Sequence, residues 1–191
     1  MNSILKFVFL IVALILFYAC SNSKSLFEED QSEWFISGEA TWGLENGELV
    51  GSITNGTGFI MTNTQFEDFV LSMDFKPDSS INSGVFIRCQ HKEISSSTCY
   101  EINIWDLNPN QDYRTGGVVS IAKPLNYVET INTWNTFRIK MVKQHLQVWI
   151  NDVLTTDIHD KALRRGYIGL QAQDDGFIKF RKIRIKEYRE F

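Results

Sequence analysis

The sequence lacks the motifs of the best-known hydrolases and nucleotide-binding proteins. It contains no G-x-S-x-G, no P-loop and no H-E-x-x-H. Its three histidines, His91, His145 and His159, are far apart without the spacing of metal ligands. Triad, phosphate-binding and zinc-protease chemistry are therefore unsupported. No metal site and no cofactor are expected, although a divalent metal stays an open alternative.

An excess of positive charge is also missing. The chain of 191 residues has a net charge of −4 at pH 7, with 19 Lys and Arg against 23 Asp and Glu. Nucleic-acid-binding domains usually carry a basic patch or stripe, so nucleic acid is not an expected partner. Aromatic residues are plentiful at 13%. Aromatic-rich β domains often use such a surplus on a binding face.

Long helical periodicity is absent as well, with no apolar pattern longer than about one turn. Apolar and polar residues instead alternate over 69–75, as in a half-buried strand. The runs 137–141 and 146–150 predict a hairpin, and Asn46-Gly47 predicts another. Many short strands separated by turns predict an all-β sandwich.

The first residues have the layout of a secretory signal. Lys6 precedes a short apolar stretch, 7–17, and the small residue Ala19 then precedes Cys20. A cysteine in this place is typical of bacterial lipoproteins, whose lipid chains anchor them to a membrane. We therefore expect a signal peptide over 1–19, lipidation of Cys20, and a domain in the bacterial cell envelope that faces the periplasm or the cell exterior. A plain transmembrane anchor or an ordinary signal peptide is the alternative.

The rest of the chain predicts a polar, flexible tether over 20–32 and one β domain over 33–191. This domain contains Cys89 and Cys99, and an oxidising compartment favours a disulfide between them over two separate thiols. Cys89 alternates with the core residues of its strand, whereas Cys99 alternates with Glu101. A bond between them therefore requires a bulge or an irregular strand end.

Residues 100–106, YEINIWD, carry the clearest binding pattern. The apolar side chains suit a core face, which leaves Glu101, Asn103 and Trp105 on the other face. These residues offer a hydrogen-bond acceptor, a two-way hydrogen-bonding amide and a stacking plane, the mixture that sugars need. An ordinary polar outer face is the plainer interpretation.

Residues 82–88, NSGVFIR, begin with turn-prone residues and enter a strand. If Val85 and Ile87 face the core, Gly84 and Arg88 face the opposite surface. A glycine there would let a ligand approach the backbone. A turn followed by a strand with a snorkelling arginine is the alternative.

Two later segments add candidates. Residues 115–124, TGGVVSIAKP, predict a strand whose Lys123 could meet an anionic oxygen. In 167–176, Gln171 and Gln173 lie opposite the apolar face and suit hydroxyl recognition. A solvated lysine and a polar hairpin are the plainer interpretations.

Together these segments resemble the bacterial 3-keto-disaccharide hydrolase domain family. The resemblance rests on NSGVFIR at 82–88, YEINIWD at 100–106, TGGVVSIAKP at 115–124, WNTFRI at 134–139, VWINDV at 148–153 and YIGLQAQDDGFIKFRKIRIKEY at 167–188. It implies a concanavalin A-like jelly-roll sandwich of two antiparallel sheets. It also implies cleavage of glycosides whose sugar carries a ketone at carbon 3.

Such a ketone acidifies the hydrogen on carbon 2, so a base can remove it while the neighbouring glycosidic oxygen leaves. By position, the resemblance makes Glu101 the base candidate, with Asp106 as the alternative. It makes Arg88 and Lys123 the candidates for stabilising the enolate. The implied sugar contacts are Asn103, Trp105, Gln171 and Gln173.

One departure from the family bears on activity. Members commonly carry a histidine after the leucine-glutamine pair near the C-terminus, where this chain has Ala172 and Gln173. The missing imidazole would be a natural proton shuttle at neutral pH. Two functions therefore stay open: a hydrolase or lyase that acts on 3-keto-glycosides, and a non-catalytic carbohydrate-binding surface lipoprotein.

Overall fold

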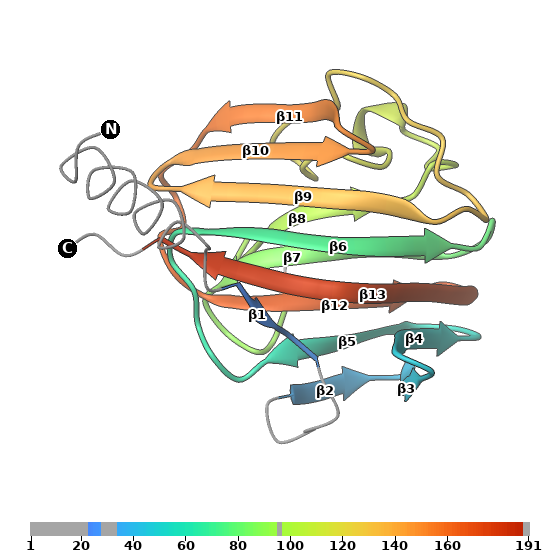
Figure 1. The fold of residues 1–191 in the computed structure, drawn as a ribbon. Helices are drawn as coiled ribbons and strands as arrows, with labels where there is room; N and C mark the ends of the chain where they lie inside the picture. The colour runs from blue at the N-terminus through green and yellow to red at the C-terminus, as the bar shows by residue number, and fades with distance from the viewer. Residues whose placement is uncertain (1–22, 28–33, 95–96, 189–191) are drawn as a thin grey trace, which may run out of the picture.

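A computed structural model describes residues 23–27, 34–94 and 97–188, which form two antiparallel sheets. Sheet A has the strand order β11-β10-β9-β6-β13-β4-β3, with β1 joined to β13, and sheet B has the order β2-β5-β12-β7-β8. Figure 1 shows β10, β9, β6 and β13 as one layer in front of β8, β7 and β12. The predicted all-β sandwich is confirmed.

The strands of sheet A are β1 (Lys24–Ser25), β3 (Thr41–Glu45), β4 (Glu48–Ile53), β6 (Phe69–Pro77), β9 (Asn135–Val142), β10 (His145–Ile150), β11 (Val153–His159) and β13 (Gly176–Glu187). The strands of sheet B are β2 (Trp34–Gly38), β5 (Thr57–Thr62), β7 (Asn82–Cys89), β8 (Tyr100–Ile104) and β12 (Tyr167–Gln173). The only helix in the described ranges is one 3-10 turn, Gln111–Tyr113. No helix there is long and apolar enough to cross a membrane.

The core lies between the sheets and follows the alternation of the sequence. On β6 every second residue from Phe69 to Phe75 is buried, while the intervening residues are half-buried. On β12 the apolar residues Ile168, Leu170 and Ala172 are buried in the same core. Burying each large apolar side chain contributes about 1.5–3 kcal/mol, so this pattern fixes which face of each strand points outward.

The predicted hairpins are confirmed. β3 and β4 are joined at Asn46 and Gly47, whose φ angles of 52° and 77° suit a tight turn. β9 and β10 pair directly, with Phe137 opposite Ile150 and Met141 opposite Leu146.

The segment predicted as a flexible tether takes part in the fold. Lys24 and Ser25 pair with Ile185 and Arg184 of β13, and the Phe27 side chain is buried in the core. The prediction over 20–32 is therefore wrong for these residues. Backbone groups can pair with a sheet edge whatever the polarity of the side chains, and burial of the Phe27 side chain packs the segment against the core. The expected signal peptide and Cys20 lie outside the described residues.

The strand predicted over 115–124 is also wrong. Val118 forms isolated bridges with Ile102 and Ala122, because the backbone turns back on itself at Ser120, where φ is 63°. The segment is a loop that lies along β8, and the amide of Val119 donates to the carbonyl of Glu101 over 3.0 Å. This loop forms one border of the outer face of sheet B.

Candidate functional site

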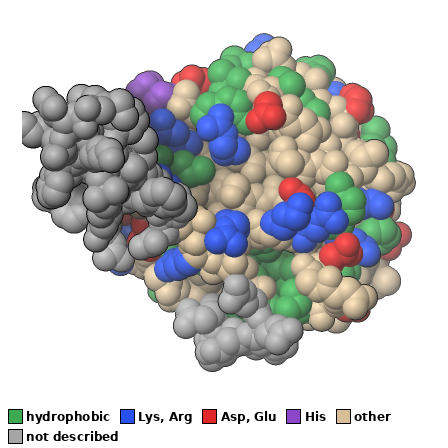
Figure 2. All heavy atoms as spheres, in the orientation of Figure 1, with side chains coloured by type: hydrophobic (Ala, Val, Ile, Leu, Met, Phe, Trp, Pro, Cys, Tyr) green, Lys and Arg blue, Asp and Glu red, His purple; other side chains and the backbone are tan. Residues whose placement is uncertain are grey.

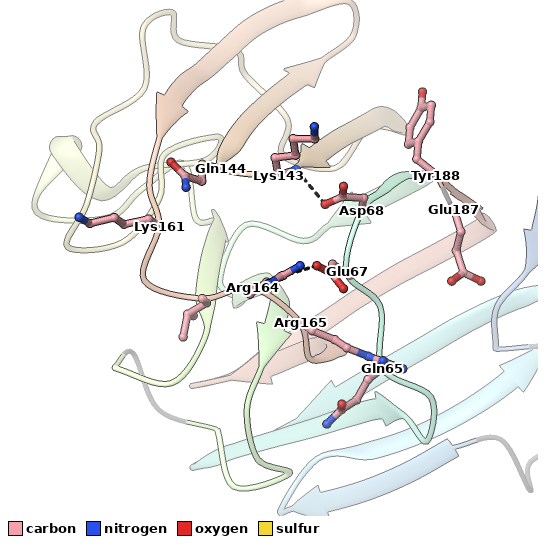
Figure 3. A pocket seen from close by; sticks show the side chains of 11 residues that line it. Gln65, Glu67, Asp68, Lys143, Gln144, Lys161, Arg164, Arg165, Glu187 and Tyr188 are labelled. Carbon is pink, nitrogen blue, oxygen red and sulfur yellow. Dashed lines mark hydrogen bonds and ion pairs between the residues drawn. The ribbon is translucent and has the colours of Figure 1, made fainter. Parts of the chain in front are cut away.

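A cavity of about 730 Å³ lies at one end of the sandwich. Figure 3 shows its side chains, which come from the loops before β6, between β9 and β10, and between β11 and β12, and from the end of β13. Its three acidic groups already have partners: Glu67 accepts from Arg164 Nε at 2.6 Å, Asp68 accepts from the amide of Lys143 at 2.8 Å, and Glu187 lies 3.5 Å from Lys24 Nζ. The cavity therefore presents no carboxylate prepared for proton transfer.

Arg88 lies behind this end of the sandwich and not on the outer face of sheet B, where the sequence placed it. Its side chain is 1% exposed and donates to the backbone carbonyls of Glu67, Lys143 and Leu163 and to the carboxylate of Asp68. Two residues of β7 stand opposite one residue of β12 here, and Arg88 has a φ of 52°. This bulge breaks the alternation and turns the guanidinium away from the proposed site.

The same bulge explains how Cys89 and Cys99 come to lie on one face of sheet B. Beyond Arg88, Cys89 points to the outer side of sheet B, where it forms the predicted disulfide with Cys99. The two cysteines pack against Phe86 and Met61 on this side. The disulfide closes a loop at the border of the outer face.

The outer face of sheet B contains the candidate site. One row across the sheet runs from Phe35 through Met61, Gly169 and Phe86 to Glu101. The next row runs from Ser37 through Phe59, Gln171 and Gly84 to Asn103. The alternation of the sequence therefore placed Glu101, Asn103 and Gln171 correctly on one face. Because β7 alone separates β8 from β12, Glu101 and Gln171 stand on strands about 10 Å apart.

Glu101 has an environment suited to proton transfer. Its side chain is half-buried, and no side chain in the described ranges forms a hydrogen bond or ion pair with its carboxylate. Burial alone therefore raises the pKa of Glu101 from its ordinary 4.5 to about 7. A carboxyl group with this pKa exists in both forms near neutral pH, as a general base or acid requires.

This raised pKa predicts a stability cost that depends on pH. Between pH 4.5 and 7 the unfolded chain has lost the Glu101 proton that the folded chain retains, so stability falls as pH rises through this window. Glu101→Gln should therefore stabilise the fold by about 2 kcal/mol at pH 8 and leave it unchanged at pH 4. Urea unfolding at both pH values measures the difference, with Glu45→Gln as the control. An equal effect at both pH values would contradict this environment for Glu101.

Gln171 supplies an amide on the same face, in the row next to that of Glu101. Its side chain is 5% exposed, and its Nε2 donates to Gln173 Oε1 over 3.0 Å. Its Oε1 is buried without a hydrogen-bond partner. An unpaired buried oxygen costs about 1–3 kcal/mol, a cost that a sugar hydroxyl would remove by donating to it.

Gly84 lies between Glu101 and Gln171 and lets the site side chains lie close to the sheet. A Cβ atom at this position would stand 3.4 Å from Glu101 Cγ and 3.3 Å from Phe86 Cε2. The contact with Phe86 is tighter than ordinary packing and the contact with Glu101 is at its limit, so an added methyl group would press against the side chains that surround the glutamate.

We predict that Gly84→Ala lowers kcat roughly tenfold, because small displacements of a reacting group are costly, while the fold persists. Steady-state kinetics with circular dichroism measure the two effects. Gly43→Ala is the matched control, since a Cβ at Gly43 of β3 would meet nothing within 4 Å. Equal activity of the two variants would contradict the placement of Glu101 against Gly84.

A second cavity, about 650 Å³, lies on the same side of the molecule. It is lined by Phe35, Ser37, Gly38, Phe59 and residues 91–94 of the disulfide loop. Phe59 stands next to Gln171 in the register and meets Phe86 edge-on, with ring centroids 5.4 Å apart. The aromatic floor of this cavity is therefore continuous with the Gln171 side of the site.

Two residues that the sequence assigned to the site hold loops in place. Asp106 is buried and accepts hydrogen bonds from the amide and the hydroxyl of Thr130, at 2.6 and 3.0 Å. Asn103 lies on the site face, but its Nδ2 donates to the carbonyl of Tyr113 and its Oδ1 accepts from the amide of Ile104. Both side chains are thus engaged in hydrogen bonds that hold loops, so the proposal below assigns the base to Glu101 and does not rely on Asp106 or Asn103.

Trp105 and Lys123 lie at the margins. Trp105 follows the end of β8 and lines a narrow crevice with Pro77 and Ile81, away from the row of Glu101. Lys123 is exposed at the end of the loop along β8. Neither lies in the two rows that contain Glu101 and Gln171.

Sequence reasoning missed the contribution of β5 and of the disulfide loop. Phe59 occurs in an ordinary strand pattern, and only the register places it beside Gln171. Ile94 reaches over the sheet to within 3.1 Å of the position that a Cβ on Gly169 would take. The predicted disulfide indicated a closed loop but not the surface that it covers. Within 23–27, 34–94 and 97–188, no three His, Cys, Asp or Glu side chains lie together to hold a metal ion.

Residues 22–186 match a family model described as a 3-keto-alpha-glucoside-1,2-lyase-like domain. No curated protein matches the chain. Among solved structures, the chain is similar to a proposed glycosyl hydrolase from Parabacteroides distasonis at 26% identity and a TM-score of 0.77, over 87% of this chain and all of that chain (100%).

Two more distant structures share the fold. A carbohydrate-binding module from Bacillus subtilis is 18% identical with a TM-score of 0.65, over 81% of this chain and 96% of that chain. A β-glucanase from Bacillus licheniformis is 12% identical with a TM-score of 0.58, over 88% of this chain and 98% of that chain. These likenesses confirm the jelly-roll sandwich that the sequence predicts.

Proposed function

Because the chain belongs to the 3-keto-alpha-glucoside-1,2-lyase-like domain family, we propose that it cleaves 3-keto-glycosides with Glu101 as the base. The membership confirms the family resemblance of the sequence and supports a carbohydrate-active function. The observation that carries the finer proposal is the Glu101 carboxyl group, half-buried on the outer face of sheet B with its pKa raised to about 7.

The proposed reaction begins at carbon 2 of the oxidised sugar. The Glu101 carboxylate takes the proton from carbon 2, and the electron pair of that C–H bond forms an enolate with the ketone at carbon 3. The enolate then forms the double bond between carbons 1 and 2, and the bond from carbon 1 to the glycosidic oxygen breaks. The departing oxygen takes up a proton from solvent. Addition of water to the double bond would complete hydrolysis.

Other residues of the site would position the sugar. Gln171 would accept a hydrogen bond from a sugar hydroxyl at Oε1, and Gln173 keeps the Gln171 amide oriented by accepting a hydrogen bond from its Nε2. Phe59 and Phe86 offer apolar ring surface beside these amides. Lys123 stays the candidate cation for the enolate, because its loop borders β8 at Glu101. Arg88 has no part in this proposal.

Release of aglycone from 3-keto-glucosides tests the proposal. Purified protein is incubated with 3-keto-trehalose and aryl 3-keto-glucosides, and with the parent glucosides that lack the ketone. We expect release from the ketones alone, because only they have an acidified hydrogen on carbon 2. Sugar binding without release from any ketone would reject catalysis and leave a carbohydrate-binding protein.

A further inference from the structure

The outer face of sheet A gathers positive charge that the chain as a whole lacks. β9 and β13 place seven cationic side chains there: Arg138, Lys140, Lys179, Arg181, Lys182, Arg184 and Lys186. Between them, β6 adds Lys76 and one carboxylate, Asp74. Figure 2 shows Lys and Arg side chains as blue groups on this side of the molecule. The net charge of the whole chain is −4, so the charge is unevenly distributed.

On β9, β6 and β13, two neighbouring rows of this face contain no carboxylate, and Asp157 of β11 lies two strands beyond Lys140 in one of them. One row brings Lys140 and Lys186 to either side of Val70, and the next brings Arg138 and Arg184 to either side of Ser72. Four cations thus stand within two rows and three strands, where like charges repel. An anionic surface laid against these rows would relieve that repulsion.

The N-terminal segment of the described chain lies beside the same rows. Arg184 donates from Nε to Ser23 Oγ at 3.1 Å and from Nη2 to the Ser23 carbonyl at 3.0 Å. Cys20, the expected lipidation site, comes only three residues before Ser23. Three residues span at most about 11 Å, so a lipid on Cys20 would hold Arg184 close to the headgroup layer.

We propose that the outer face of sheet A lies against an anionic phospholipid surface, with Arg138, Lys140, Arg184 and Lys186 facing the headgroups. Basic residues beside a membrane anchor are drawn to anionic lipids. The proposal rests on the expected lipid at Cys20, and it turns sheet B, with Glu101, away from the membrane. An acidic polysaccharide would also be attracted to these charges, but the short connection to Cys20 favours the membrane.

Vesicle sedimentation tests the proposal. The chain from residue 20 onward, with Cys20→Ser, retains every described residue of the sandwich and removes the lipid. We expect it to bind vesicles that contain both phosphatidylglycerol and phosphatidylcholine, and not to bind vesicles of phosphatidylcholine alone. Salt should release the bound protein. Lys140→Gln with Lys186→Gln should weaken binding roughly 25-fold, at about fivefold for each charge removed.

The matched control removes the same charge at positions away from β9 and β13, with Lys92→Gln and Lys123→Gln. Lys92 lies on the disulfide loop over sheet B, and Lys123 lies on the loop beside β8. We expect this control to bind within about twofold of the parent chain. Equal loss in both double variants, or no vesicle binding by the parent chain, would overturn the proposal. Retention on polygalacturonate without vesicle binding would overturn it in favour of an acidic polysaccharide.

Discussion

Glu101→Gln is expected to lower kcat for release from 3-keto-glycosides by roughly 100- to 10,000-fold, the usual contribution of a positioned general base. The substitution keeps the shape and the polar end of the side chain but removes its ability to take a proton. The Michaelis constant should change little, because the amide still occupies the same place beside Gly84. Steady-state kinetics with one 3-keto-glucoside measure both constants. The rate of the parent protein should rise with pH around the Glu101 pKa of about 7.

The control for this variant is Glu45→Gln, at the exposed turn between β3 and β4. It should leave both constants unchanged. Undiminished release by Glu101→Gln would show that another group takes the proton, and the assignment of the base would be wrong. Because Glu101→Gln is expected to be more stable than the parent protein at pH 8, misfolding would not explain a loss of rate at that pH.

Arg88→Ala is expected to lower the free energy of unfolding by about 3–5 kcal/mol, the cost of breaking a buried ion pair. The guanidinium satisfies the carbonyls of Glu67, Lys143 and Leu163 together with the Asp68 carboxylate. Without it, these oxygens lose their donor at the end of the sandwich. The melting temperature should fall by roughly 6–20 °C. Scanning calorimetry or thermal circular dichroism measures the change.

Arg165→Ala is the matched control, because Arg165 lines the end cavity but is exposed. It should stay within about 0.5 kcal/mol of the parent protein. Below its melting temperature, Arg88→Ala should retain the kcat of the parent protein per folded molecule. If Arg88→Ala kept normal stability but lost activity, we would conclude instead that Arg88 takes part in the reaction.

Alternation of residues was enough to predict most of the fold and part of the site. Glu101 and Gln171 lie on one face because each strand has apolar residues that must point to the core, which forces their neighbours outward. The same rule failed at Arg88, where a bulge inserts a residue. It also failed at Val118, where a pattern of β-branched residues is used in a loop. A periodic pattern does not reveal where the ladder slips or ends.

Residue type proved a weaker guide than residue placement. Asp106 and Asn103 have side chains suited to catalysis or sugar binding, yet both are used to hold loops. Phe59 carries no polar signal, yet the register of β5 and β12 places it beside Gln171. These distinctions depend on hydrogen bonds and strand pairings between distant segments. Such long-range contacts cannot be predicted from the pattern of a single sequence.

The most direct test of the central claim follows the hydrogen on carbon 2. A 3-keto-glucoside is incubated in heavy water with the parent protein or with Glu101→Gln, and NMR measures deuterium at carbon 2 in the recovered substrate and the hydrolysed sugar. The account predicts deuterium at carbon 2 of the hydrolysed sugar with the parent protein and almost none with the variant. Release of aglycone with the original hydrogen still on carbon 2, or equal deuterium uptake by both proteins, would contradict it.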